Sequence, residues 1–179
     1  MNNETCEAHG IYVVKCINSA GVTIWEDVID NVVCTEGKNA MFNAALNGSS
    51  YTVTGPYMGL ISSVSYSSVN ATNTAANINS SNGWNEAGSS TNYPLYTTPR
   101  KTCAWSSASA GSIALSAALS FPIITTGGTV KGCFIIFGSG ASSTIANTSG
   151  TLLSAGLFSG GDKVVNPGDT IQVSYSISM

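Results

Sequence analysis

Charged residues are scarce in this sequence. Its 179 residues include six Lys and Arg and nine Asp and Glu, so 8% of the chain is charged, against about 25% in an average soluble domain. With a net charge of −3 and so few cations, the chain has no basic patch to neutralise phosphates, and we expect no nucleic-acid partner. Disorder driven by charge is also excluded, because hydrophobic residues make up 43% of the chain and supply a core.

Residue types that perform catalysis are equally sparse. The single histidine, His9, lies in a polar N-terminal stretch, which leaves Ser-His-Asp and Cys-His mechanisms without a well-placed base. On a strand, Glu26 and Asp30 share one face about 13 Å apart, while Asp27 points to the other face. A glycosidase needs its two carboxyl groups within about 9.5 Å of each other. We therefore expect neither an enzyme nor a cofactor.

Targeting and membrane-spanning signals are missing from the sequence. The stretch 1–5 has no cationic start and leads into no apolar segment, so a secretory signal is not expected. The longest apolar runs, such as residues 133–137, are far shorter than the ~18 residues that span a bilayer. We expect a soluble protein, made in a cytoplasm, with no membrane partner.

The five cysteines form no Cys-x-x-Cys pair, and an odd number without a secretory signal does not indicate a disulfide framework. A zinc site built from Cys6, His9, Cys16 and Cys34 has the right ligand types. Only Cys6 and His9 are closely spaced, however, whereas structural zinc sites usually bring two close ligand pairs. Buried thiols are the simpler interpretation, so we expect no metal, and a zinc assay on the purified protein separates the two alternatives.

What the sequence does contain is β-strand patterning. Serine and threonine number 27 and 18, and β-branched runs alternate with Gly-, Asn- and Pro-containing turns. These runs predict strands over residues 11–17, 22–33, 57–66, 100–106, 112–124, 129–137, 151–158 and 170–178. The alternation is cleanest in the last of them, where one face carries Ile171, Val173, Tyr175 and Ile177.

One helix interrupts the strands. Ala, Met and Leu favour a helix over residues 38–47, and Asn47-Gly48 suits its C-terminal end. Residues 67–92 form the longest predicted loop, and loops of that length are usually functional or mobile. Seven to nine strands with one helix and no βαβ rhythm predict an all-β, antiparallel β-sandwich, with jelly-roll topology as the leading choice. The length fits a single domain over residues 11–179, preceded by a flexible arm over residues 1–10.

A set of short stretches spread along the chain forms a recognisable pattern. They are Trp25-Glu26-Asp27 with Val32-Val33, Gly37-Lys38-Asn39, residues 51–62 (YTVTGPYMGLIS), Arg100-Lys101 with Ala104-Trp105, Gly132-Cys133-Phe134, residues 154–158 (SAGLF), residues 160–165 (GGDKVV), residues 168–171 (GDTI) and residues 173–176 (VSYS). Together they resemble a family of virion structural proteins of tailed, mainly short-tailed, bacteriophages. The resemblance covers most of residues 22–179, and the chain departs from the pattern at residues 70–82 and in its first twenty residues.

The resemblance implies a non-enzymatic virion component made in the bacterial host's cytoplasm. The leading hypothesis is a head decoration (cement) protein that binds the major capsid protein and stabilises the capsid. A homotrimer is expected, because such proteins are often trimers and closed oligomers protect exposed strand edges. The alternative is a tail, tail-fibre or head–tail connector component that binds a host surface or bridges head and tail.

Five residues are candidate partner contacts. Asn2, Asn3 and Glu4 belong to the polar N-terminal arm, which we expect to become ordered by lying on a neighbouring subunit. Trp84 lies in the long predicted loop, where it either packs against its own loop or, if exposed, anchors a contact. Tyr93 follows at the end of the same loop.

Overall fold

The computed structural model describes residues 7–47, 54–97 and 99–179. The order of elements is β1 (His9–Ile17), β2 (Thr23–Val33), α1 (Thr35–Leu46), β3 (Tyr57–Ser62), a 3-10 turn (Ala75–Asn77), β4 (Lys101–Thr102), β5 (Ser112–Ala114), β6 (Leu119–Pro122), β7 (Gly128–Phe137), β8 (Thr151–Leu157), β9 (Lys163–Val165) and β10 (Thr170–Ser178).

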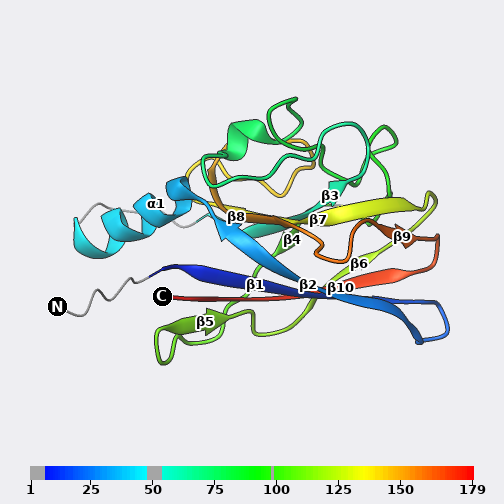
Figure 1. The fold of residues 1–179 in the computed structure, drawn as a ribbon, viewed down its shortest axis with the longest axis horizontal. Helices are drawn as coiled ribbons and strands as arrows, with labels where there is room; N and C mark the ends of the chain where they lie inside the picture. Colours follow the sequence, from blue (N-terminus) through cyan, green and yellow to red (C-terminus); the bar gives the residue numbers. More distant parts are fainter. Residues whose placement is uncertain (1–6, 48–53, 98) are drawn as a thin grey trace.

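All ten strands belong to one antiparallel sheet. Its main order is β4-β3-β7-β8-β2-β1-β10-β5, with β6 also paired to β10 and β9 to β7. The sheet curls into a half-barrel, and β2 makes the turn: its first part pairs with β1, and Val32 and Val33 pair with β8. Figure 1 shows β2 running obliquely from the layer of β3, β7 and β8 to the layer of β1 and β10.

The predicted all-β fold with one helix is confirmed, while a two-sheet sandwich or a jelly roll is not confirmed by this topology. Several predicted boundaries were wrong. The third strand ends at Ser62, and the stretch 112–124 breaks into β5 and β6, because the Ser116 amide between them bonds to the Ala104 carbonyl. Strand β9 was not predicted, and α1 begins three residues earlier than expected.

The inner face of the curled sheet holds the main core. The predicted alternation of β10 is confirmed, because Ile171, Val173, Tyr175 and Ile177 are all buried. Tyr12 on β1 packs against Tyr175 with ring centroids 4.4 Å apart, and its hydroxyl lies 2.6 Å from the Ser154 hydroxyl of β8. The core therefore ties the β1–β10 layer to the β7–β8 layer.

Strand β7 is buried on both faces. Residues 132–137 are all buried, which explains their uninterrupted apolar sequence. One face points into the main core, and the other contacts a second apolar cluster that includes Ile78, Trp84, Phe134 and Ile136. This second cluster lies under the long connection between β3 and β4, which caps the sheet in Figure 1.

The two ends of the curled sheet are linked through the same connection and through the residues that follow β4. The Ile124 amide donates to the Leu95 carbonyl at 2.9 Å, the Thr97 amide to the Pro122 carbonyl at 3.0 Å, and the Ser116 amide to the Ala104 carbonyl at 2.9 Å. These bonds satisfy backbone groups that an open edge would offer to another chain.

At the N-terminus, the predicted arm boundary needs correction. Strand β1 starts at His9, and both His9 and Gly10 pair with β10, so the last residues of the expected arm belong to the sheet. The described cysteines, Cys16, Cys34, Cys103 and Cys133, are buried free thiols. Among the helices of the described residues, none has the length and apolar character needed to cross a membrane.

Candidate interaction surface

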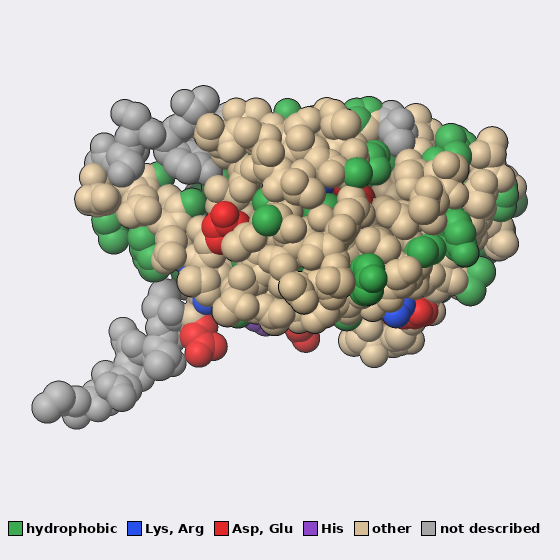
Figure 2. Space-filling view, turned by 90° about the horizontal axis from the view of Figure 1, so that it is seen from above, with side chains coloured by type: hydrophobic (Ala, Val, Ile, Leu, Met, Phe, Trp, Pro, Cys, Tyr) green, Lys and Arg blue, Asp and Glu red, His purple; other side chains and the backbone are tan. Residues whose placement is uncertain are grey.

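The surface formed by residues 63–97 and 138–150, called the loop face here, covers the outer side of β3, β7 and β8. Its sequence is rich in Ser, Asn and Thr. Figure 2 looks down on this side of the molecule, and few charged side chains appear on it. Polar, uncharged side chains therefore dominate what the loop face can offer to another molecule.

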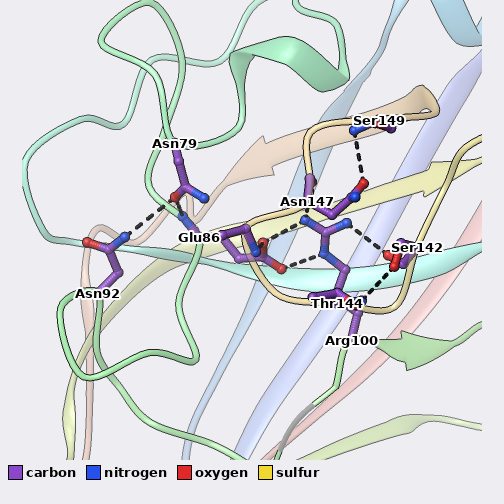
Figure 3. Close-up of polar contacts among 9 residues, drawn as sticks. Asn79, Glu86, Asn92, Arg100, Ser142, Thr144, Asn147 and Ser149 are labelled. Atoms are coloured by element: carbon purple, nitrogen blue, oxygen red, sulfur yellow. Dashed lines mark hydrogen bonds and ion pairs between the residues drawn. The ribbon is translucent and has the colours of Figure 1, made fainter.

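A buried ion pair holds the two loops together. Arg100 Nε and Nη2 each lie 2.6 Å from a carboxylate oxygen of Glu86, and neither side chain is exposed. Arg100 also donates to the carbonyls of Ser142 at 3.0 Å and Asn147 at 2.7 Å, and the Ala146 amide donates to Glu86 at 2.7 Å. Figure 3 shows both loops converging on this pair, which joins residues 63–97 to residues 138–150.

Burial and neighbouring groups together determine the electrostatics of the Glu86–Arg100 pair. Burial raises the pKa of Glu86, and the Arg100 guanidinium and the Ala146 amide oppose that rise. The guanidinium carbon lies 5.3 Å from the centre of the Phe134 ring, on the underlying strand β7. Carboxylate and guanidinium are thus used to fix loop geometry, with nothing left facing solvent.

Asparagine side chains make the rest of the loop rigid. Asn79 accepts from the Glu86 amide at 2.9 Å, and Asn85 donates to the Val64 carbonyl at 2.9 Å. Asn77 and Thr74 form a reciprocal cap on the 3-10 turn. Asn side chains commonly replace backbone partners in turns, and here they give the long predicted loop an ordered structure without regular strands.

The predicted contact residues have different positions. Trp84 is fully buried and packs on Phe134 with ring centroids 5.5 Å apart, so it packs under its own loop and exposes nothing to a partner. Tyr93 is 40% exposed at the edge of the loop face, and its carbonyl accepts from the Ser62 hydroxyl at 2.6 Å. Asn2, Asn3 and Glu4 lie outside the described residues.

Two of the acids on β2 have separate partners. Asp27 forms an ion pair with Lys163 at 2.7 Å and accepts from the Ser159 hydroxyl and the Gly160 amide. Asp30 lies on the exposed face, 3.8 Å from His9. Within residues 7–47, 54–97 and 99–179, no three His, Cys, Asp or Glu side chains come together to hold a metal ion, and Cys6 of the zinc hypothesis lies outside those ranges.

The Glu86–Arg100 pair was not predicted, although the sequence contains a signal for it. Arg100 is the single arginine of the chain, and Glu86 is the single acid between Glu36 and Asp162. The single arginine and a lone anion in such a charge-poor stretch favour each other as partners, because an unpaired buried charge is very costly.

The assembled surface can bind through shape, hydrogen bonds and two half-exposed aromatic side chains, Tyr66 and Tyr93. It is pre-ordered, so a partner would meet loops whose conformation is already fixed. Comparisons of the chain with protein-family models, with curated proteins and with solved structures found no match.

Proposed function

We propose that this chain is a non-enzymatic structural protein of a tailed bacteriophage virion. In the form we favour, it decorates the head, binds the major capsid protein and stabilises the capsid. The proposal starts from the sequence resemblance, which extends over most of residues 22–179.

One structural observation carries the proposal: an ion pair is buried to build an ordered, charge-poor loop face. Ordering loops costs conformational entropy on binding, and a surface ordered in advance avoids that cost. A capsid protein offers a fixed, repeated surface, and a rigid partner suits it better than a flexible one. Tyr66 and Tyr93, which are 47% and 40% exposed, are the side chains of this face that can act as aromatic anchors.

The proposal includes two finer assignments. The curled sheet would belong to the jelly-roll class found among head decoration proteins, and the chain would assemble as a homotrimer in the virion. A homotrimer multiplies the contacts of each loop face, so binding to a repeated surface gains through multivalency.

The alternative is a tail, tail-fibre or head–tail connector component. The composition of the loop face supports this alternative, because Asn, Ser and Thr side chains, together with the exposed tyrosines, suit hydrogen bonding and stacking with a surface glycan of the host.

Copy number in purified particles separates the two forms of the proposal. A head decoration protein is expected at hundreds of copies per particle and a tail component at about a dozen or fewer, and densitometry of particle proteins measures the difference. Tyr93→Ala should weaken binding to particles, whereas Val22→Ala, an exposed change in the β1–β2 connection and outside the loop face, should not. If the protein is absent from particles purified from infected cells, the virion proposal fails.

A further inference from the structure

Among the described residues, helix α1 is anchored through its first half. Gly37 packs so closely on β8 that a Cβ there would lie 2.9 Å from the Leu152 carbonyl oxygen, and Glu36 accepts from the Leu152 amide at 3.0 Å. From Phe42 to Leu46, every residue is exposed. Figure 1 shows the helix projecting from the sheet, so among the described residues nothing covers its second half.

Local interactions do little to stabilise this half. Cys34 at the N-cap makes no side-chain capping bond, and the last turn has no basic residue to interact with the helix dipole. Isolated helices of about twelve residues are marginal in water, and helices in proteins gain most of their stability by packing an apolar face. The exposed half of α1 therefore lacks the packing that stabilises most helices of this length.

An apolar groove of about 620 Å³ lies beside the exposed half. Its walls are Ala8, Met41, Phe42, Ala45, Leu46 and Met179, with one acid, Glu7, and one base, Lys38. Phe42, Leu46 and Met179 are 54%, 80% and 58% exposed. Because Phe42 and Leu46 are four residues apart, they form a ridge along the helix, directly beside the groove.

We propose that this surface, the α1 ridge with its groove, joins copies of the chain, with Phe42 and Leu46 of one copy packed into the groove of the next. Ridge and groove occur together on each copy, so the surface is complementary to itself. The charges agree with this occupant. Glu7 and Lys38 make no ion pair within the described part of the chain, and a second copy brings one opposite charge to each.

Another exposed apolar set, Val13, Ile24 and Val28, lies on the outer face of β1 and β2, and these side chains are 46–51% exposed. There, Lys15 stands directly opposite Glu26 across the two strands, so the register already places a cation and an anion side by side on this face. One solvated face is also usual for an antiparallel sheet. This face is therefore the weaker candidate, and it serves as the control.

Sedimentation velocity and light scattering on the full chain test the proposal. We expect a wild-type oligomer, and we expect Phe42→Glu and Leu46→Glu to raise its dissociation constant about 100-fold or more, because each places a charge in an apolar contact. Both side chains are exposed, so circular dichroism of the variants should match the wild type. Val28→Glu, a comparably exposed change on the sheet face, should leave association unchanged.

A charge exchange tests the orientation of the contact. Lys38→Glu and Glu7→Lys should each weaken association, and an equimolar mixture should associate more tightly than either variant alone, because opposite charges meet again across the contact. A wild-type monomer at high concentration, an unchanged Leu46→Glu oligomer, or dissociation by Val28→Glu would overturn the proposal.

The α1 ridge and its groove would be the surface that holds together the oligomer of the proposed function. This contact and the virion function can nevertheless fail independently. An oligomer of two or four copies that depends on Leu46 would reject the trimer and keep the α1 contact. Absence of the protein from particles would reject the virion function without affecting either measurement.

Discussion

The carbonyl oxygen of Gly156 on β8 occupies the space that a side chain on Gly132 of β7 would need: a Cβ there would lie 1.9 Å from that oxygen. The two strand backbones approach closely because neither residue has a side chain. We expect Gly132→Ala to lower the free energy of unfolding by more than about 3 kcal/mol, since a strand backbone has to move.

Urea unfolding followed by fluorescence measures this change. Val164→Ala removes methyl groups from a side chain that is 63% exposed, and it should alter stability by less than about 0.5 kcal/mol. A Gly132→Ala variant as stable as the wild type would show that β7 and β8 can separate locally at little cost.

Removing one partner of the Glu86–Arg100 pair should destabilise the fold more than replacing both partners with apolar residues. Arg100→Met leaves a buried carboxylate without its partner and should cost about 3–5 kcal/mol. The double variant Glu86→Leu with Arg100→Met should cost clearly less than the sum of the two single changes, because it removes both charges together. Strict additivity in a double-mutant cycle would argue against direct coupling.

The Asp27–Lys163 pair gives the fold a pH dependence. Burial acts to raise the pKa of Asp27, but hydrogen bonds from Lys163, Ser159 and the Val28 and Gly160 amides outweigh it, so the pKa lies below its usual value. A lowered folded-state pKa adds stability above the unfolded pKa of about 3.9, and this stability is lost as the pH falls through the folded value. Asp27→Asn should therefore melt at a lower temperature than the wild type at pH 7, and the gap should narrow toward about pH 2. A constant gap over this range would contradict the prediction.

The described cysteines should be unreactive in the native protein. Burial raises the pKa of Cys16, Cys34 and Cys103 to about 12 and raises that of Cys133 further. The thiolate is the reactive form, so at pH 8 a thiol reagent should modify these four only after unfolding in urea. Peptide mapping by mass spectrometry identifies the modified positions, and fast native labelling of Cys103 would reveal local opening.

Attachment to particles, if the proposed function is right, should depend little on salt. Salt screens exposed charges, and the loop face has few of them (Figure 2). Particles washed at low salt and at 0.5 M salt, well above physiological ionic strength, should retain similar amounts of the protein. Release at 0.5 M salt alone would point to a contact based on ion pairs.

Patterns within single strands were readable from the sequence. The alternation in β10 and the continuous apolar run in β7 correctly predicted strands, because side chains on a strand alternate between faces and a strand buried on both sides can be apolar throughout. Helix α1 was found from its residue preferences, although its apolar side chains at Phe42 and Leu46 are exposed.

The global arrangement was not readable. Whether the strands form one curled sheet or two separate sheets depends on where β2 changes partner, from β1 to β8. The alternation of apolar and polar residues along β2 would be the same in both arrangements. The loop face was missed for a similar reason. Its order comes from asparagine hydrogen bonds and from an ion pair between two residues fourteen positions apart, Glu86 and Arg100. A periodic pattern of apolar and polar residues does not reveal such contacts.

The pairing of β1 with β10 has a consequence for engineering. His9 and Ser178 are directly opposite each other. Strand β1 therefore begins, and strand β10 ends, at the same side of the molecule (Figure 1). Chains whose ends lie close together tolerate circular permutation. A short linker from the end of β10 to the start of β1, with new termini opened in the β1–β2 connection, would turn β10 and β1 into a continuous hairpin and move the attachment point for a fused domain to the opposite end of the sheet.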